Sequence, residues 1–152
     1  THTQQASFVI HELFERMRSN RAGVIAGDYI TSDGAAVSGV SIDCSTAISP
    51  DCGGSTACTT AELAAYDIHT IQCGSNATGA VSSGVGVQII NGSFAVTCTA
   101  PAVTPPLCSP DVGVTFSWTE RLSDKNIQGT DAEGGNIDEA LEAQTMTINA
   151  TI

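Results

Sequence analysis

The residues with the most distinctive chemistry in this sequence are six cysteines in a chain of 152 residues. Cysteine thiols can bind zinc, lie buried as free side chains or pair as disulfides. The sequence has no Cys-x-x-Cys motif, and no histidine (His2, His11 or His69) stands at a zinc-ligand spacing from a cysteine pair. An even number of cysteines in a polar, lysine-poor chain instead favours disulfides formed in an oxidising compartment. We therefore expect disulfide bonds among Cys44, Cys52, Cys58, Cys73, Cys98 and Cys108.

The pairing of these cysteines stays open, because six cysteines allow 15 connectivities and the sequence alone does not choose among them. A bridge between Cys98 and Cys108 would close the proline-rich loop of residues 100–110. In the chain-entropy description, closing a loop of this length contributes about 3 kcal/mol to stability.

Positive charge is concentrated near the start of the chain, where Arg16, Arg18 and Arg21 supply three of the five basic residues. Residues 1–28 are neutral overall, whereas the remaining 124 residues hold two basic and 13 acidic side chains. One interpretation is a docking surface for acidic partners, since arginine forms bidentate pairs with carboxylates. The other is a solvated helix end, where the helix dipole favours cations. Both interpretations stay open.

The overall composition excludes two classes of partner. The formal net charge is −11, and only 14% of the residues are charged. Nucleic-acid binding normally needs a clustered basic surface, and attraction to anionic membranes needs a polybasic segment. We expect neither. No stretch reaches the roughly 18 apolar residues that a membrane-spanning helix requires.

A calcium site is the main metal hypothesis, on the segment 124–139. Asp124, Asn126 and Gln128 stand at the first, third and fifth loop positions, followed by Gly129 at the sixth. Gly135 replaces the bidentate glutamate that the twelfth position needs. We therefore favour an acidic flexible loop and expect no metal and no cofactor.

Enzyme chemistry finds little support in the sequence. Asp67 and His69 are two residues apart on an expected helix, so their side chains point in different directions. No serine lies in a nucleophile-elbow pattern, and no glycine-rich phosphate loop precedes a helix. We expect a non-catalytic protein.

The elements that would position these residues begin with a helix over residues 1–22, which carries an apolar stripe at helical spacing. Asn20, Gly23 and Gly27 are candidate stops. Such a helix is marginal alone in water, so its stripe must pack on other elements. We expect the stripe to cover a sheet through Ala6, Val9, Ile10, Leu13, Phe14 and Met17.

A loop region over residues 23–84 contains a short helix over about 60–71, which begins with a capping box between Thr59 and Glu62. Residues 85–152 then hold four runs that alternate apolar and polar residues, the first two joined by an Asn91-Gly92 turn. Alternation with one polar face predicts an antiparallel sheet that is covered on one side. The sequence therefore predicts a single α+β domain with four strands.

Three segments of the sequence, residues 11–23, 58–67 and 114–118, together resemble PilV-type minor pilins of type IV pili. Residues 11–23, His-Glu-Leu-Phe-Glu-Arg-Met-Arg-Ser-Asn-Arg-Ala-Gly, resemble that family's Glu-Arg-Met-Arg-Ala-Asn-Arg segment, and Gly-Asp-Tyr at 27–29 continues it. Residues 58–67, Cys-Thr-Thr-Ala-Glu-Leu-Ala-Ala-Tyr-Asp, resemble its second motif. Residues 114–118, Val-Thr-Phe-Ser-Trp, resemble its Val-Thr-Val-x-Trp strand. The three segments occur in the family's order.

The resemblance implies the type IV pilin fold, in which a long N-terminal helix packs on a four-stranded antiparallel sheet. Cys44 and Cys58 match the family's usual cysteines, and the other four are additional. The family's leader and apolar helix half are not in this sequence, so we expect a soluble domain that meets a membrane only through that missing half.

The implied function is non-catalytic. A minor pilin takes part in priming pilus assembly and sits near the fibre tip through contacts with other minor pilins and the major pilin. Before assembly it is anchored in the inner membrane with its domain in the periplasm. Two alternatives stay open, namely a minor pseudopilin of type II secretion and a disulfide-rich secreted adhesin or glycan-binding module.

Overall fold

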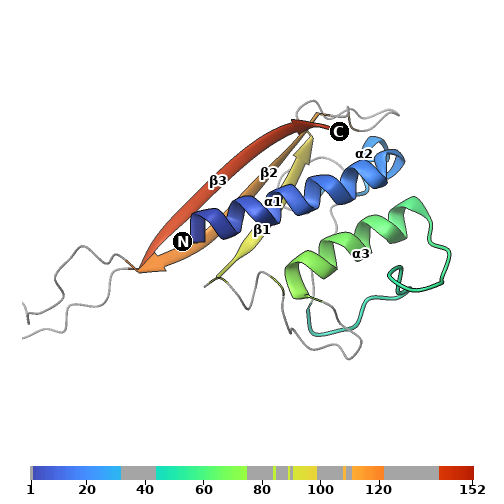
Figure 1. Cartoon of the computed structure of the whole chain (residues 1–152), viewed down its shortest axis with the longest axis horizontal. Helices are drawn as coiled ribbons and strands as arrows, with labels where there is room; N and C mark the ends of the chain where they lie inside the picture. The colour runs from blue at the N-terminus through green and yellow to red at the C-terminus, as the bar shows by residue number, and fades with distance from the viewer. Residues whose placement is uncertain are drawn as a thin grey trace, which may run out of the picture.

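The α+β class and the antiparallel sheet expected from the sequence are present in the computed structural model. It describes residues 2–31, 44–74, 84, 89, 91–98, 108, 111–121 and 141–152. In these residues, helix α1 lies against one face of a sheet of strands β1, β2 and β3, and helix α3 lies beside α1 (Figure 1). Helix α1 contacts strands β2 and β3 below it and helix α3 beside it.

Helix α1, His2–Ser19, forms where apolar side chains recur every three or four residues. Five of the six stripe residues are buried in the common core, and Val9 is half-buried against it. The buried members are Ala6, Ile10, Leu13, Phe14 and Met17.

A second helix, α2 (Arg21–Ala26), follows directly after a turn at Asn20. Gly23 lies inside α2, and a β-carbon at Gly23 would come within 2.6 Å of the Asn20 amide nitrogen. The missing side chain of Gly23 therefore makes room for the buried amide of Asn20. Gly27 ends α2 in the left-handed conformation at φ 81°, where its N–H donates to carbonyls in α2.

Helix α3, Thr60–Cys73, confirms the expected short helix and its capping box. The Thr59 hydroxyl accepts a hydrogen bond from the backbone N–H of Glu62, and the Glu62 carboxylate accepts one from the backbone N–H of Thr59. Because these bonds favour the charged carboxylate, they lower the pKa of Glu62.

The sheet is a meander in the order β1–β2–β3, with both pairs antiparallel. Its strands are β1 (Ser93–Cys98), β2 (Asp111–Arg121) and β3 (Leu141–Thr151). Alternation places the apolar side chains of all three strands on the face toward α1. The strongest example is the row of Val112, Val114, Phe116 and Trp118 on the central strand, all buried.

The expectation of a four-stranded pilin fold was wrong, because the sheet of the described residues has three strands. Of the run expected over 85–89, only Ile89 is described, and it lies outside any strand. The Gly92 N–H donates to the carbonyl of Ile89, which closes a turn just before β1. At the edge of β1, Thr31 takes both backbone groups of Val96: its N–H donates to the Val96 carbonyl at 3.3 Å, and its hydroxyl accepts from the Val96 N–H.

The expected long N-terminal helix was also wrong. Helix α1 has 18 residues and ends at Ser19, before the predicted end at residue 22. The turn at Asn20 interrupts the helical run because the Asn20 side chain turns inward to bond Thr60 and Tyr29.

All six cysteines are paired, as expected, and the bonds are Cys44–Cys73, Cys52–Cys58 and Cys98–Cys108. The first joins Cys73, at the end of α3, to Cys44, which precedes that helix in the chain. The third joins Cys98, at the end of β1, to Cys108. The Cys108 N–H donates to the carbonyl of Ile25 at 3.0 Å, which connects this bridge to α2. In the chain-entropy description each bond adds about 2–4 kcal/mol.

The stripe of α1 generates a stability prediction. Leu13 is fully buried, so Leu13→Ala should lower the free energy of unfolding by about 2–5 kcal/mol through lost burial and a residual cavity. Phe8→Ala is the matched control on the same helix, because Phe8 is 77% exposed and its truncation should change stability by less than about 0.5 kcal/mol. Urea unfolding of the oxidised protein measures both. Equal losses in the two variants would contradict the packing of α1.

Candidate functional site

A buried polar cluster lies where α1, the segment after α2 and α3 meet. It consists of Arg16, Asn20, Tyr29 and Asp67, and is called the Asp67 cluster below. The Asp67 side chain is 6% exposed, yet both of its oxygens are hydrogen-bonded. Arg16 donates to Oδ1 at 3.1 Å, and the Tyr29 hydroxyl donates to Oδ2 at 2.6 Å. The carboxylate therefore joins three segments of the chain.

The charges in the cluster are balanced by their immediate neighbours. Burial and the neighbouring Asp67 carboxylate raise the pKa of Tyr29, so its hydroxyl stays protonated and keeps donating. Burial alone would lower the pKa of Arg16, but hydrogen bonds to Glu12 and Asp67 outweigh it and raise that pKa. A buried carboxylate with an arginine and a tyrosine donor satisfies the usual requirement for burying a charge.

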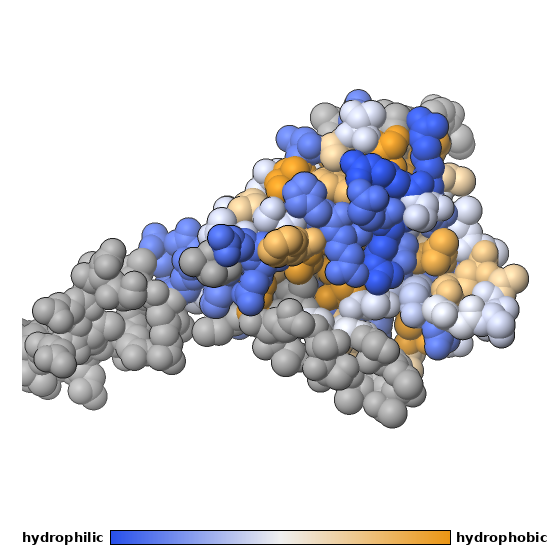
Figure 2. Space-filling model, viewed as in Figure 1, coloured by the Kyte–Doolittle hydropathy of each residue, from blue (hydrophilic) through white to orange (hydrophobic). Residues whose placement is uncertain are grey.

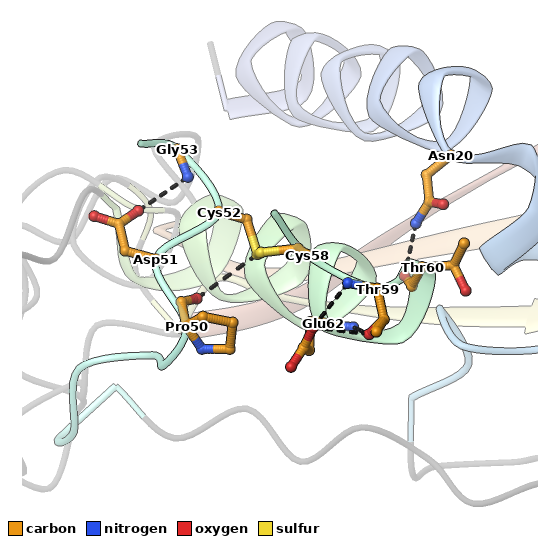
Figure 3. The surroundings of a disulfide bond; sticks show 9 residues. All are labelled: Asn20, Pro50, Asp51, Cys52, Gly53, Cys58, Thr59, Thr60 and Glu62. Atoms are coloured by element: carbon orange, nitrogen blue, oxygen red, sulfur yellow. Dashed lines mark hydrogen bonds between the residues drawn. A yellow bond between two sulfur atoms is a disulfide. The ribbon is translucent and has the colours of Figure 1, made fainter. Parts of the chain in front are cut away.

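Asn20 extends the cluster to the start of α3. Its side-chain N–H groups donate to the Thr60 carbonyl at 2.8 Å and to the Tyr29 hydroxyl at 3.3 Å. Figure 3 shows the Asn20 amide reaching from the end of α1 to Thr60, next to the capping box. The first turn of α3 is thus held both by its own cap and by α1.

The disulfide Cys52–Cys58 stands directly before this capping box (Figure 3). Where the small loop that it closes begins, the carboxylate of the preceding residue Asp51 accepts from the N–H of Gly53 at 3.0 Å. A β-carbon at Gly53 would come within 2.2 Å of the Tyr66 hydroxyl, so the loop lies tightly against α3. Residues 53–57 are nevertheless exposed, which leaves a covalently closed loop on the surface.

The chemistry that the Asp67 cluster can perform is structural. Both acceptor oxygens of Asp67 are occupied by donors, and Tyr29 is 1% exposed. An acid or base must reach the group it protonates, directly or through one water. The arrangement instead holds α1 and α3 at a fixed position.

The three arginines expected at a partner interface have different surroundings. Arg16 is bound within the chain by Glu12 and Asp67, with 29% of its side chain exposed. Arg18 pairs with the exposed Glu15 and is itself 48% exposed. Arg21 donates to the carbonyl of Ile152 at 3.1 Å, from an exposed position. The structure thus gives Arg16 an internal contact and leaves Arg18 and Arg21 on the surface.

The outward face of α1 is mostly hydrophilic, as the view in Figure 2 shows. It carries Gln4, Gln5, Glu12, Glu15 and Arg18, and among the described residues Phe8 is the large hydrophobic side chain that it exposes. No helix among the described residues is long and apolar enough to cross a membrane.

The other candidate residues do not gather into a site. His69 is buried on α3, and its Nε2 lies 3.2 Å from the Thr46 carbonyl, whereas the neighbouring Asp67 faces α1. In the part of the chain that the structure describes, no group of three metal-binding side chains occurs. The calcium hypothesis for residues 124–139 falls outside the described residues.

Sequence reasoning missed the Asp67 cluster, although a signal was present. Asp67 falls between Ala64, Ile68 and Ile71 on the buried face of α3, and Asn20 continues the spacing of Leu13 and Met17. A polar residue in an apolar stripe predicts a buried polar partner.

Comparisons of the chain with models of protein families, with curated proteins and with solved structures give no match.

The two carboxylates that pair with Arg16, those of Asp67 and Glu12, lead to a stability prediction. Asp67→Ala leaves a buried tyrosine hydroxyl and part of a guanidinium without their acceptor, so it should cost about 3 kcal/mol of stability. Glu12→Ala is the matched control, because Glu12 bonds the same arginine while 58% exposed; it should cost less than about 1 kcal/mol. Denaturant unfolding compares them, and a loss at Asp67 no larger than at Glu12 would contradict a stabilising role for the cluster.

Tyr29 generates a pH prediction. Its pKa is raised in the folded state above the ordinary value of 10.0, so above that pH the folded chain holds a proton that the unfolded chain releases. Stability is then lost as the pH rises, with a slope approaching about 1.4 kcal/mol per pH unit. Tyr29→Phe should be less stable than the wild type at pH 8 and should lack this alkaline slope. Unfolding measured between pH 8 and pH 11 tests it, and parallel curves for the two proteins would refute it.

Proposed function

We propose that this protein is a non-catalytic minor pilin, which takes part in priming type IV pilus assembly and stays near the fibre tip through contacts with other pilins. In this role the domain stands in the periplasm before assembly and on the fibre afterwards. The proposal does not rest on the sheet, which has three strands instead of four.

The observation that carries the proposal is where the pilin-like segments meet. The first two segments, 11–23 and 58–67, together with the continuation at 27–29, supply every residue of the Asp67 cluster. Arg16 comes from the first segment, Tyr29 from its continuation and Asp67 from the second. Residues that resemble one family at separate places in the chain thus depend on one another physically. Such dependence supports the view that the resemblance is not a chance match of short strings.

The exposed side of α1 supports a role in contacts with other proteins. Its charged pair Glu15–Arg18 and the exposed ring of Phe8 lie on the face that points away from the sheet and the core. An exposed aromatic ring and a charged pair on the same side of a helix are a common composition for the centre and rim of a protein interface. The partners proposed for this face are other minor pilins and the major pilin.

The experiment is to delete the gene in its own host and restore it with variants, counting pili by electron microscopy. Deletion should remove most pili, and the wild-type gene should restore them. Arg18→Glu should fail to restore them, because it reverses a charge on the proposed contact face, while the purified variant should unfold like the wild type since exposed ion pairs add little stability.

Thr97→Glu is the control, because it adds an acidic residue at an exposed site on β1, away from α1. Normal pilus numbers after deletion would overturn the proposal. A secretion defect with normal pili would point to the pseudopilin, and strong saturable binding on a glycan array with normal pili would point to the adhesin.

A further inference from the structure

The two edges of the sheet differ in the hydrogen bonds that their outer strands make. On the β1 side, Thr31 pairs with both backbone groups of Val96, and the disulfide Cys98–Cys108 ties down the end of the strand. On the β3 side, no backbone group of the described residues bonds to the edge that faces away from β2. In Figure 1, β3 runs along the outside of the sheet over its whole length.

Strand β3 lacks the features that usually protect such an edge. Natural edge strands are shortened, bulged, or marked by lysine or proline so that they do not pair with another chain. Strand β3 has 11 residues, contains no lysine, proline or glycine, and has Glu142 as its single charged residue. Its pairing with β2 continues without a bulge from Leu141 to Thr151. An edge of this kind is a template for another β-strand.

We propose that β3 pairs with β3 of a second copy of this chain, antiparallel, so that two sheets join into one sheet of six strands. The inference does not depend on the pilin proposal, because it uses only the sheet.

The side-chain pattern of β3 makes it complementary to itself. Met146 and Ile148 lie half-buried on the inner face, and Thr145, Thr147 and Asn149 are exposed on the outer face. In antiparallel pairing about Thr147, Met146 of one copy faces Ile148 of the other, and Thr145 faces Asn149. At the centre of the pairing, Met146 and Ile148 thereby gain apolar neighbours, and Thr145, Thr147 and Asn149 gain neighbours that can form hydrogen bonds.

The existing pairing of β3 with β2 is built in the same way. Met146 and Ile148 stand opposite Phe116 and Val114 on the inner face. On the outer face the hydroxyls of Thr115 and Thr147 are 2.9 Å apart. A second β3 would repeat on the open side the contacts that β2 makes on the closed side.

The distribution of charge selects the antiparallel arrangement. Each chain has a net charge of −11, which opposes self-association. The connection from β2 to β3 holds five acidic residues and one lysine in positions 122–140, and it joins β3 at Leu141. Antiparallel pairing puts the starts of the two β3 strands at opposite ends of the new contact, about 35 Å apart for eleven residues. Glu142 would then lie opposite Ile152 and not opposite another acid.

The test is sedimentation equilibrium of the 152-residue chain from micromolar to near-millimolar concentration, together with hydrogen exchange at both ends of that range. The mass should rise from 15.5 kDa toward twice that value. At high concentration, amides in residues 141–152 should gain protection, while amides in residues 93–98 should not. Because exchange is measured on the wild type, this readout does not depend on a variant folding.

Thr147→Lys should weaken association by about tenfold or more, because it places two ammonium groups opposite each other at the centre of the pairing. Ser93→Lys is the matched control: it puts the same charge on an exposed site of the same sheet face, on the β1 edge. A wild type that stays at 15.5 kDa would overturn the proposal. Equal association of the two variants, or a dimer protected outside residues 141–152, would overturn it as well.

Discussion

The buried Asp67 carboxylate fixes how helices α1 and α3 lie relative to each other. A charge at this depth needs close donors, and the donors come from α1 and from the segment after α2. If either helix shifted by one turn, the carboxylate would be buried with a donor missing. Apolar packing between α1 and α3 alone would permit such shifts, since hydrophobic contact has no direction. The cluster therefore fixes the relative position of α1 and α3, whereas the burial of apolar side chains supplies most of the stability of their contact.

Two of the three disulfides attach a residue outside the helices and strands to the last residue of a helix or strand. Cys44–Cys73 holds a loop against the end of α3, and Cys98–Cys108 brings the Cys108 N–H to the Ile25 carbonyl. Because α2, β1 and α3 are each attached in this way, the described part of the fold is tied together mainly on the β1 side of the sheet.

The sequence predicted the features that depend on local pattern and missed those that depend on meeting in space. The spacing of Leu13 and Met17 indicated the buried side of α1, and Thr59 with Glu62 indicated where α3 begins. Alternation predicted a fourth strand because it shows which face each side chain takes, whereas pairing also requires a free edge. At Val96 the edge of β1 is occupied by Thr31. The Asp67 cluster and the cysteine pairing join residues up to 51 positions apart, and no local pattern encodes such contacts.

Contacts between residues distant in the sequence also explain why the two edges of the sheet differ. Thr31 can reach Val96 because Gly27 ends α2 and turns the chain back toward β1, while Tyr29 is held by Asp67 on the way. The Asp67 cluster thus closes one edge of the sheet as a consequence of positioning the helices. Among the described residues, no equivalent backbone contact reaches the outer edge of β3, and the helix that contacts β3 is α1, over its inner face. In the described part of the chain, the buried charge and the disulfide Cys98–Cys108 thus act near the β1 edge. On the β3 edge the side-chain pattern decides, and that pattern favours the proposed pairing with a second copy.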